Sequence, residues 1–108
     1  MNPLEIAKQI TELTNENSKG SDALFTAEVE LAEAENNLDL IEQKAFIRSQ
    51  GTVADRTALA RLEASQARLE RDLAKARANR IRVKIKSLET AIMASATQAK
   101  LLSAEMRL

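Results

Sequence analysis

The chain contains no cysteine, histidine, tryptophan or tyrosine, and each of these absences removes a class of site. Without cysteine and histidine there is no disulfide framework and no Cys/His zinc centre. The usual nucleophile–base pairs are missing for the same reason, and there is no glycine-rich phosphate loop and no serine elbow. We therefore expect neither an enzyme nor a bound cofactor.

Residues that break helices are equally scarce. The only proline, Pro3, lies where a first helix can begin, and the two glycines are Gly20 and Gly51. Of the 108 residues, 44% are hydrophobic and 30% are charged, a composition typical of long helices and coiled coils. No apolar run is long enough for a membrane span, and no signal peptide is visible, so a cytoplasmic location is expected.

A heptad pattern runs through the first half of the chain. Apolar residues recur in alternating steps of three and four, the spacing of a helix that buries one stripe. The register holds from residue 6 to residue 45 although Gly20 falls within it, so we expect one helix with a weak point there. Its members are Ile6, Ile10, Leu13, Asn17, Gly20, Leu24, Ala27, Leu31, Ala34, Leu38, Ile41 and Ala45.

The stretch RSQGTVADR, residues 48–56, predicts a stop and a restart. Gly51 suits the left-handed conformation that closes a helix. Thr52 and Asp55 have the spacing of a capping box, in which each side chain accepts the other's backbone N–H. The pattern therefore places a turn between two long helices.

The second helix is expected to carry a seam that shifts register once. A first set is Leu59, Leu62, Gln66, Leu69 and Leu73, and a second set is Ile81, Ile85, Leu88, Ile92, Ser95, Ala99, Leu102 and Met106. The step of eight residues between Leu73 and Ile81 predicts a stutter that locally unwinds the supercoil.

Together these signals predict an all-α, antiparallel helical hairpin in one domain, residues 1–108. Helix 1 is expected at about 3–50, the turn at 51–52 and helix 2 at about 53–107. Because an isolated helix pair buries little surface, we expect a homo-oligomer. Its interface is predicted in the uncharged C-terminal stretch and its surroundings, at Ile92, Met93, Leu101, Leu102 and Met106.

Charge is distributed unevenly although the net charge is zero. Residues 1–50 carry ten acidic and four basic residues, whereas residues 51–108 carry six acidic and twelve basic residues. The carboxylates of the first half fall at flanking or outward heptad positions, and no histidine accompanies them. We interpret them as a solvated or salt-bridging face and expect no metal site.

The densest basic run, KARANRIRVKIK, contains no acidic residue. With the turn near residues 51–52, residue i should lie opposite about residue 103 − i. The run at 77–86 would then face residues 17–26, which hold only Asp22 and Lys19 as charges. Pairing within the chain would leave this run without partners, although acidic residues of another subunit could supply them.

Three interpretations of the run follow: intersubunit charge pairing, nucleic-acid binding and attraction to an anionic membrane. The membrane ranks last because the apolar residues of RIRVKIK scatter around a helix. Without tyrosine or tryptophan, a base-stacking platform is not expected, so any nucleic acid would be held by its phosphates. The predicted nucleic-acid-binding residues are Lys75, Arg77, Arg80, Arg82, Lys84 and Lys86.

A family resemblance favours nucleic acid among these alternatives. The segment EQKAFIRSQGTVADRTALA, the basic run and the C-terminal LLSAEMRL resemble short helical-hairpin proteins of tailed phages, which are similar to recombination mediators of the UvsY type. Lys44, Ala45, Arg48, Thr52 and Arg56 carry the likeness around the turn. It implies a closed oligomer that binds single-stranded DNA and contacts a recombinase and a single-strand-binding protein, in the host bacterial cytoplasm.

A structural role is the alternative that the sequence leaves open. In that case the chain is a coiled-coil oligomerisation module or adaptor, such as a virion or assembly component, with no nucleic-acid role. The charge asymmetry would then serve only pairing between helices and subunits.

Overall fold

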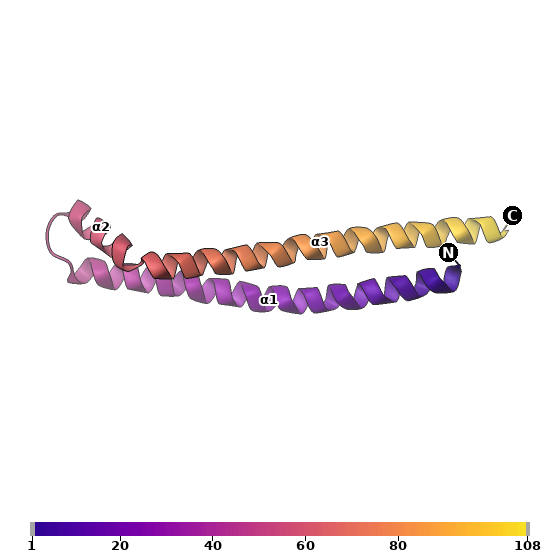
Figure 1. Cartoon of the computed structure of the whole chain (residues 1–108), viewed down its shortest axis with the longest axis horizontal. Coiled ribbons are helices and arrows are strands. Elements are labelled where there is room, and N and C mark those ends of the chain that lie inside the picture. The colour runs from indigo at the N-terminus through magenta and orange to yellow at the C-terminus, as the bar shows by residue number, and fades with distance from the viewer. Residues whose placement is uncertain (1, 108) are drawn as a thin grey trace. The chain divides into compact units, whose positions relative to one another are not determined.

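The computed structural model describes residues 2–107, and the regular structure in that range is entirely α-helical (Figure 1). The helices are α1 (Pro3–Arg48), α2 (Val53–Glu63) and α3 (Ser65–Arg107), which confirms the all-α prediction. The chain divides into two compact units. In the first, the chain up to Leu24 packs with the chain from Arg80 onward, and Phe25–Asn79 forms the second.

Helix α1 is capped at its start and runs without a break through Gly20. Asn2 Oδ1 accepts the backbone N–H of Glu5 at 2.8 Å, and the Glu5 carboxylate accepts the backbone N–H of Asn2 at 3.3 Å. This reciprocal pair satisfies two donors at the helix start. Every position of the predicted register, from Ile6 to Ala45, is buried or half-buried, so the inward face of α1 was predicted correctly.

The turn has the chemistry that its sequence predicts. Gly51 has φ 112°, a left-handed conformation that favours glycine. The Thr52 hydroxyl accepts the Asp55 backbone N–H at 3.1 Å, and the Asp55 carboxylate accepts the Thr52 N–H at 3.4 Å. The Arg56 guanidinium donates to the Phe46 carbonyl at 2.9 and 3.1 Å and stacks 4.3 Å from the Phe46 ring centroid. The turn is therefore held by a cap at the start of α2 and by a contact of Arg56 with the end of α1.

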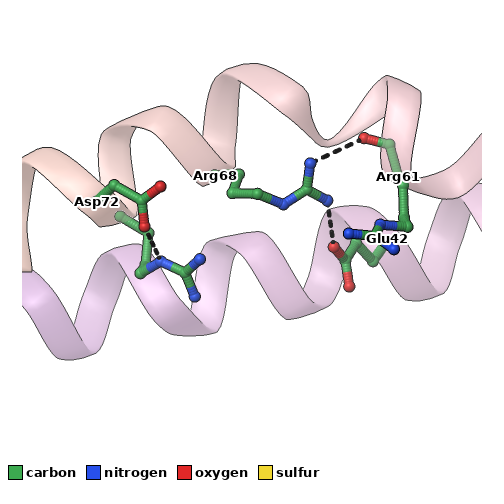
Figure 2. A network of polar contacts seen from close by, with 5 residues as sticks. Glu42, Arg61, Arg68 and Asp72 are labelled. Atoms are coloured by element: carbon green, nitrogen blue, oxygen red, sulfur yellow. Dashed lines mark hydrogen bonds and ion pairs between the residues drawn. The ribbon is translucent and has the colours of Figure 1, made fainter.

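A break at Ala64 divides the second helix, which the sequence predicted as continuous from residue 53 to about 107. Ala64 has φ −88° and ψ 5°, and it lies between α2 and α3. The Arg68 guanidinium donates to the Arg61 carbonyl at 3.4 Å and to Glu42 Oε1 at 2.9 Å (Figure 2). A side chain that binds a carbonyl of the helical ladder in this way is a recognised cause of a kink. No glycine or proline marks the site, so the break could not be predicted from the sequence.

The inward face of α2 and of the start of α3 differs from the prediction. The predicted members Leu59, Leu62, Gln66, Leu69 and Leu73 are all exposed. The buried positions are instead Ala60, Ala64, Ala67, Ala74 and Ala78, which we call the alanine seam, with Arg71 half-buried among them. This register continues in steps of three and four from Ala78 to Ile81 and on to Leu102. The predicted stutter is therefore wrong, and so is the final seam position, because Met106 is exposed.

Alanine lies inside because α1 supplies the larger side chains. Leu38, which is 6% exposed, packs with Ala64, Ala67 and the half-buried Ile41. Small residues on one helix leave room for large residues on the other, and interiors fill to a constant density by such alternation. The hydrophobicity of leucine is greater, but leucine at these seam positions would push the helices apart.

Exchange of size across this contact gives a direct stability test. We expect Ala67→Leu to lower the free energy of unfolding by about 1–3 kcal/mol, because it overpacks a position that is 4% exposed. Leu69→Ala should cost less than about 1 kcal/mol, because Leu69 is 50% exposed. Urea denaturation of both variants checks the order. A larger loss for Leu69→Ala would show that the leucines face α1.

The Arg68 contacts predict a measurable coupling with Glu42. Arg68→Met should lower the free energy of unfolding by about 1–2 kcal/mol, because the Arg61 carbonyl loses its donor and Glu42 loses its partner. A double-mutant cycle with Glu42→Gln should give a coupling of about 0.5–1 kcal/mol. Fully additive losses in urea denaturation would contradict a shared network.

Candidate nucleic-acid interface

All six predicted nucleic-acid-binding residues are exposed on α3. Lys75 and Arg77 belong to the second unit, whereas Arg80, Arg82, Lys84 and Lys86 belong to the first.

In the second unit, Arg77 has an acidic neighbour that the sequence register did not predict. Its guanidinium lies 3.8 Å from Glu30 Oε2. The Arg77 side chain is 59% exposed and the Glu30 side chain is 50% exposed. The register predicted residue 26 opposite Arg77, so the true pairing is displaced along α1. An exposed ion pair at this distance contributes little to stability. Arg77 is therefore a member of the helix-to-helix charge pairing, and Lys75 has no ion pair among the described residues.

In the first unit, Arg82 also has an interaction within the protein. The expectation that the whole run lacks partners is thus wrong for Arg77 and Arg82. Within residues 2–107, Arg80, Lys84 and Lys86 make no ion pair and no side-chain hydrogen bond. Arg80 and Lys84 are four residues apart and share one face of α3, whereas Lys86 points from another face.

Helix packing brings a second lysine to Lys84. A groove of about 350 Å³ in the first unit is lined from α1 by Glu16, Lys19, Gly20 and Ala23, and from α3 by Ile81, Lys84, Ile85 and Leu88. Lys19 and Lys84 therefore contribute to the same concave surface from opposite helices, together with one carboxylate from Glu16. Two lysines against one glutamate leave this groove with a formal charge of +1.

Lys19 was missed as a site residue because its role depends on the register between two helices. The sequence register placed Gly20 opposite residue 83, but Gly20 packs against Ile85. Because of that displacement, Lys19 lines the same groove as Lys84 of α3. The only signal in the sequence was the position of Lys19 directly before a glycine in the inward stripe.

Gly20 allows α1 and α3 to approach closely at the floor of this groove. A Cβ atom placed on Gly20 would lie 3.0 Å from Ile85 Cγ1, tighter than an ordinary van der Waals contact. The glycine that looked like a weak point in the helix is thus the position where an isoleucine is accommodated.

The predicted oligomer interface is divided by the structure. Ile92 and Leu102 are half-buried in the seam of α3, and Leu102 lies over the same hollow as Pro3, Ala7 and Ile10 of α1. Met93, Leu101 and Met106 are 70%, 61% and 73% exposed. The first two residues therefore serve packing within the chain, and the other three present apolar surface.

Most residues that carried the family resemblance at the turn have structural partners in the second unit. Arg56 caps and stacks on Phe46, Arg48 pairs with Glu63, Thr52 caps α2, and Ala45 is fully buried. Lys44 is exposed. These residues stabilise the turn, so the pattern that they form indicates how α1 and α2 are joined.

Two classes of site find no support in the described chain. Residues 2–107 contain no group of three or more acidic side chains placed to hold a metal ion. None of the described helices is long and apolar enough to cross a membrane.

Comparison with known proteins gives no relative from which a role could be transferred. No protein-family model matches the chain, and neither does any curated protein or solved structure.

The close approach at Gly20 predicts a size limit. We expect Gly20→Val to lower the free energy of unfolding by about 1–3 kcal/mol, because the Ile85 side chain and the two helices must shift to admit a branched side chain. Ser18→Val, at an exposed position two residues earlier, is the matched control and should cost less than about 1 kcal/mol. An unchanged or higher stability of Gly20→Val in thermal and urea denaturation would contradict the size limit, because helix propensity alone favours valine over glycine.

Proposed function

We propose that this chain is an oligomeric helical hairpin that binds single-stranded DNA without sequence preference and assists DNA recombination. The observation that carries the proposal is the set of exposed bases in the first unit, Arg80, Lys84 and Lys86, which have no acidic partner among residues 2–107. Lys19 adds a fourth base from α1 at the groove that Lys84 lines.

Phosphates are the part of the nucleic acid that this surface suits. Arg80 and Lys84 are four residues apart, about 6 Å along the helix axis, which is close to the spacing of adjacent phosphates in an extended strand. Lys19 widens the surface towards α1. Arg77 and Arg82 are held by interactions within the chain, so they and Lys75 take a supporting role.

Base recognition is not part of the proposal. Of the two aromatic residues, Phe46 is stacked under Arg56, and only Phe25 is strongly exposed, at 70%. One phenylalanine cannot stack successive bases, so affinity would come from counterion release and depend strongly on salt. Single-stranded DNA held extended in this way would be available to a recombinase, and a single-strand-binding protein is the partner that such a protein would have to displace or contact.

Binding of a labelled single-stranded oligonucleotide, followed by fluorescence anisotropy at several salt concentrations, tests the proposal. The triple variant Arg80→Gln, Lys84→Gln, Lys86→Gln should weaken binding at low salt by roughly ten- to hundred-fold and reduce the salt slope by about 2. Lys19→Gln alone should reduce that slope by about 0.7.

A second triple variant, Lys8→Gln, Lys44→Gln, Lys100→Gln, removes the same charge from exposed sites elsewhere and is the matched control. It should bind nearly as wild type does. If both triple variants lose affinity equally, only net charge matters and the proposed site is wrong. If the wild type does not bind at low salt, the nucleic-acid role fails and the structural-module interpretation is preferred.

A further inference from the structure

The second unit presents a row of leucines that no part of the described chain covers. Leu59, Leu62, Leu69 and Leu73, which we call the leucine stripe, are 45%, 71%, 50% and 51% exposed. Gln66 occupies the middle position, and the steps between the five are three, four, three and four residues. The stripe thus has the spacing of a coiled-coil seam, but it lies outside the contact with α1.

The leucine stripe and the alanine seam lie on different sides of α2 and of α3, which the break at Ala64 separates. On α3, at 100° per residue, the centre of the stripe is about 140° from the centre of the seam. These helices therefore have two apolar faces, of which α1 covers only the alanine seam. A contiguous row of exposed leucines is characteristic of an association surface.

We propose that the leucine stripe pairs with the same stripe of a second copy of this chain, side by side and in parallel. In that alignment every leucine meets its own counterpart across a two-fold axis, as an isologous contact requires. Gln66 then meets Gln66 of the second copy. A side-chain amide both donates and accepts, so two of them satisfy each other, and one polar layer of this kind fixes the register of a coiled coil.

Charges beside the stripe favour the parallel alignment. Asp72 comes directly before the stripe position Leu73, and Arg77 comes directly after the next stripe position, Ala76. These are the g and e positions of a heptad, so in a parallel pair Asp72 of each copy lies beside Arg77 of the other. An antiparallel pair centred on Gln66 would instead place Glu63 near Glu70 of the second copy. Within one chain, Asp72 pairs with Arg71 and Arg77 with Glu30, but Asp72 and Arg77 are 58% and 59% exposed and can reach a second partner.

The size of the stripe predicts a reversible dimer. From Leu59 to Leu73 the chain rises at most about 21 Å across the break at Ala64, which is short for a coiled coil. A specific interface of standard size buries about 800 Å² per partner, and the leucine stripe would bury less than that. Association should therefore depend on concentration in the micromolar range.

Apart from Arg77, this association uses other residues than the nucleic-acid proposal, because the leucine stripe belongs to the second unit and the bases Arg80, Lys84 and Lys86 belong to the first. It also uses other residues than the interface predicted at Ile92, Met93, Leu101, Leu102 and Met106. Dimerisation is expected without any oligonucleotide present.

Sedimentation equilibrium of the full chain across a range of concentrations tests the surface. We expect a monomer–dimer equilibrium that the variant Leu69→Gln, Leu73→Gln weakens at least ten-fold. The matched control is Leu40→Gln, Ile47→Gln on exposed α1 positions, which should leave the equilibrium unchanged. Glutamine is a good helix former, and circular dichroism of each variant should show wild-type helix content. A wild type that is monomeric throughout, or two variants that weaken association equally, would overturn the proposal.

Disulfide trapping tests the parallel alignment separately, because the chain has no native cysteine. Ala76→Cys places a thiol at the next stripe position without removing a leucine. In the parallel dimer the two introduced thiols face each other, and oxidation should give a covalent dimer. In an antiparallel pair centred on Gln66, residue 76 would lie opposite residue 56 of the second copy. A dimer in sedimentation that gives no disulfide at residue 76 would overturn the parallel alignment.

Discussion

Close packing of small side chains against large ones is the constraint on which the rest of this structure depends. In the second unit α1 contributes Leu38 and Ile41, which pack with Ala64 at the break between α2 and α3 and with Ala67 of α3. In the first unit the roles reverse, and Gly20 of α1 makes room for Ile85 of α3. Large residues facing each other at either place would force the helices apart, so the total size across each contact is fixed.

Placement of alanine on the inside determines what the outside presents. Because Ala60, Ala67 and Ala74 occupy the contact with α1, Leu59, Leu62, Leu69 and Leu73 are turned away from it. The same register orients the basic run, bringing Arg77 to Glu30 and Lys84 to the groove that Lys19 also lines. The exposed Arg77–Glu30 pair adjusts this arrangement and does not create it, whereas the half-buried Arg68–Glu42 pair is part of the contact with α1.

The predictions were correct where the sequence contained a single signal with no competing pattern. The stripe of α1 had no competing apolar face of equal strength in its heptad, and the glycine and capping box at residues 51–55 are local features with local causes. It failed for the second helix because two heptads with the same spacing coexist there. Hydrophobicity favours the leucine heptad, but the choice depends on the size of residues that α1 brings to the contact, which is information that the helix itself does not contain.

The break at Ala64 and the groove at Lys19 were unpredictable for a related reason. The break coincides with the reach of Arg68 to both the Arg61 carbonyl and Glu42, and Glu42 lies twenty-six positions earlier in the chain. The groove depends on a register displaced from the simple estimate that a turn at residues 51–52 gives. Composition did indicate the basic run, but only the paired helices distinguish Arg77 and Arg82, which have interactions in the chain, from Arg80, Lys84 and Lys86.

Alanine methyls face α1 in α2 and in α3, and leucine methyls face outward. Solution NMR of methyl-labelled alanine and leucine, with a soluble paramagnetic agent and at concentrations where the chain is monomeric, measures which methyl groups are covered. We expect strong protection of Ala60, Ala67, Ala74 and Ala78 and strong relaxation of Leu59, Leu62, Leu69 and Leu73. Protected leucines with exposed alanines would contradict the register, and with it the surfaces derived from that register.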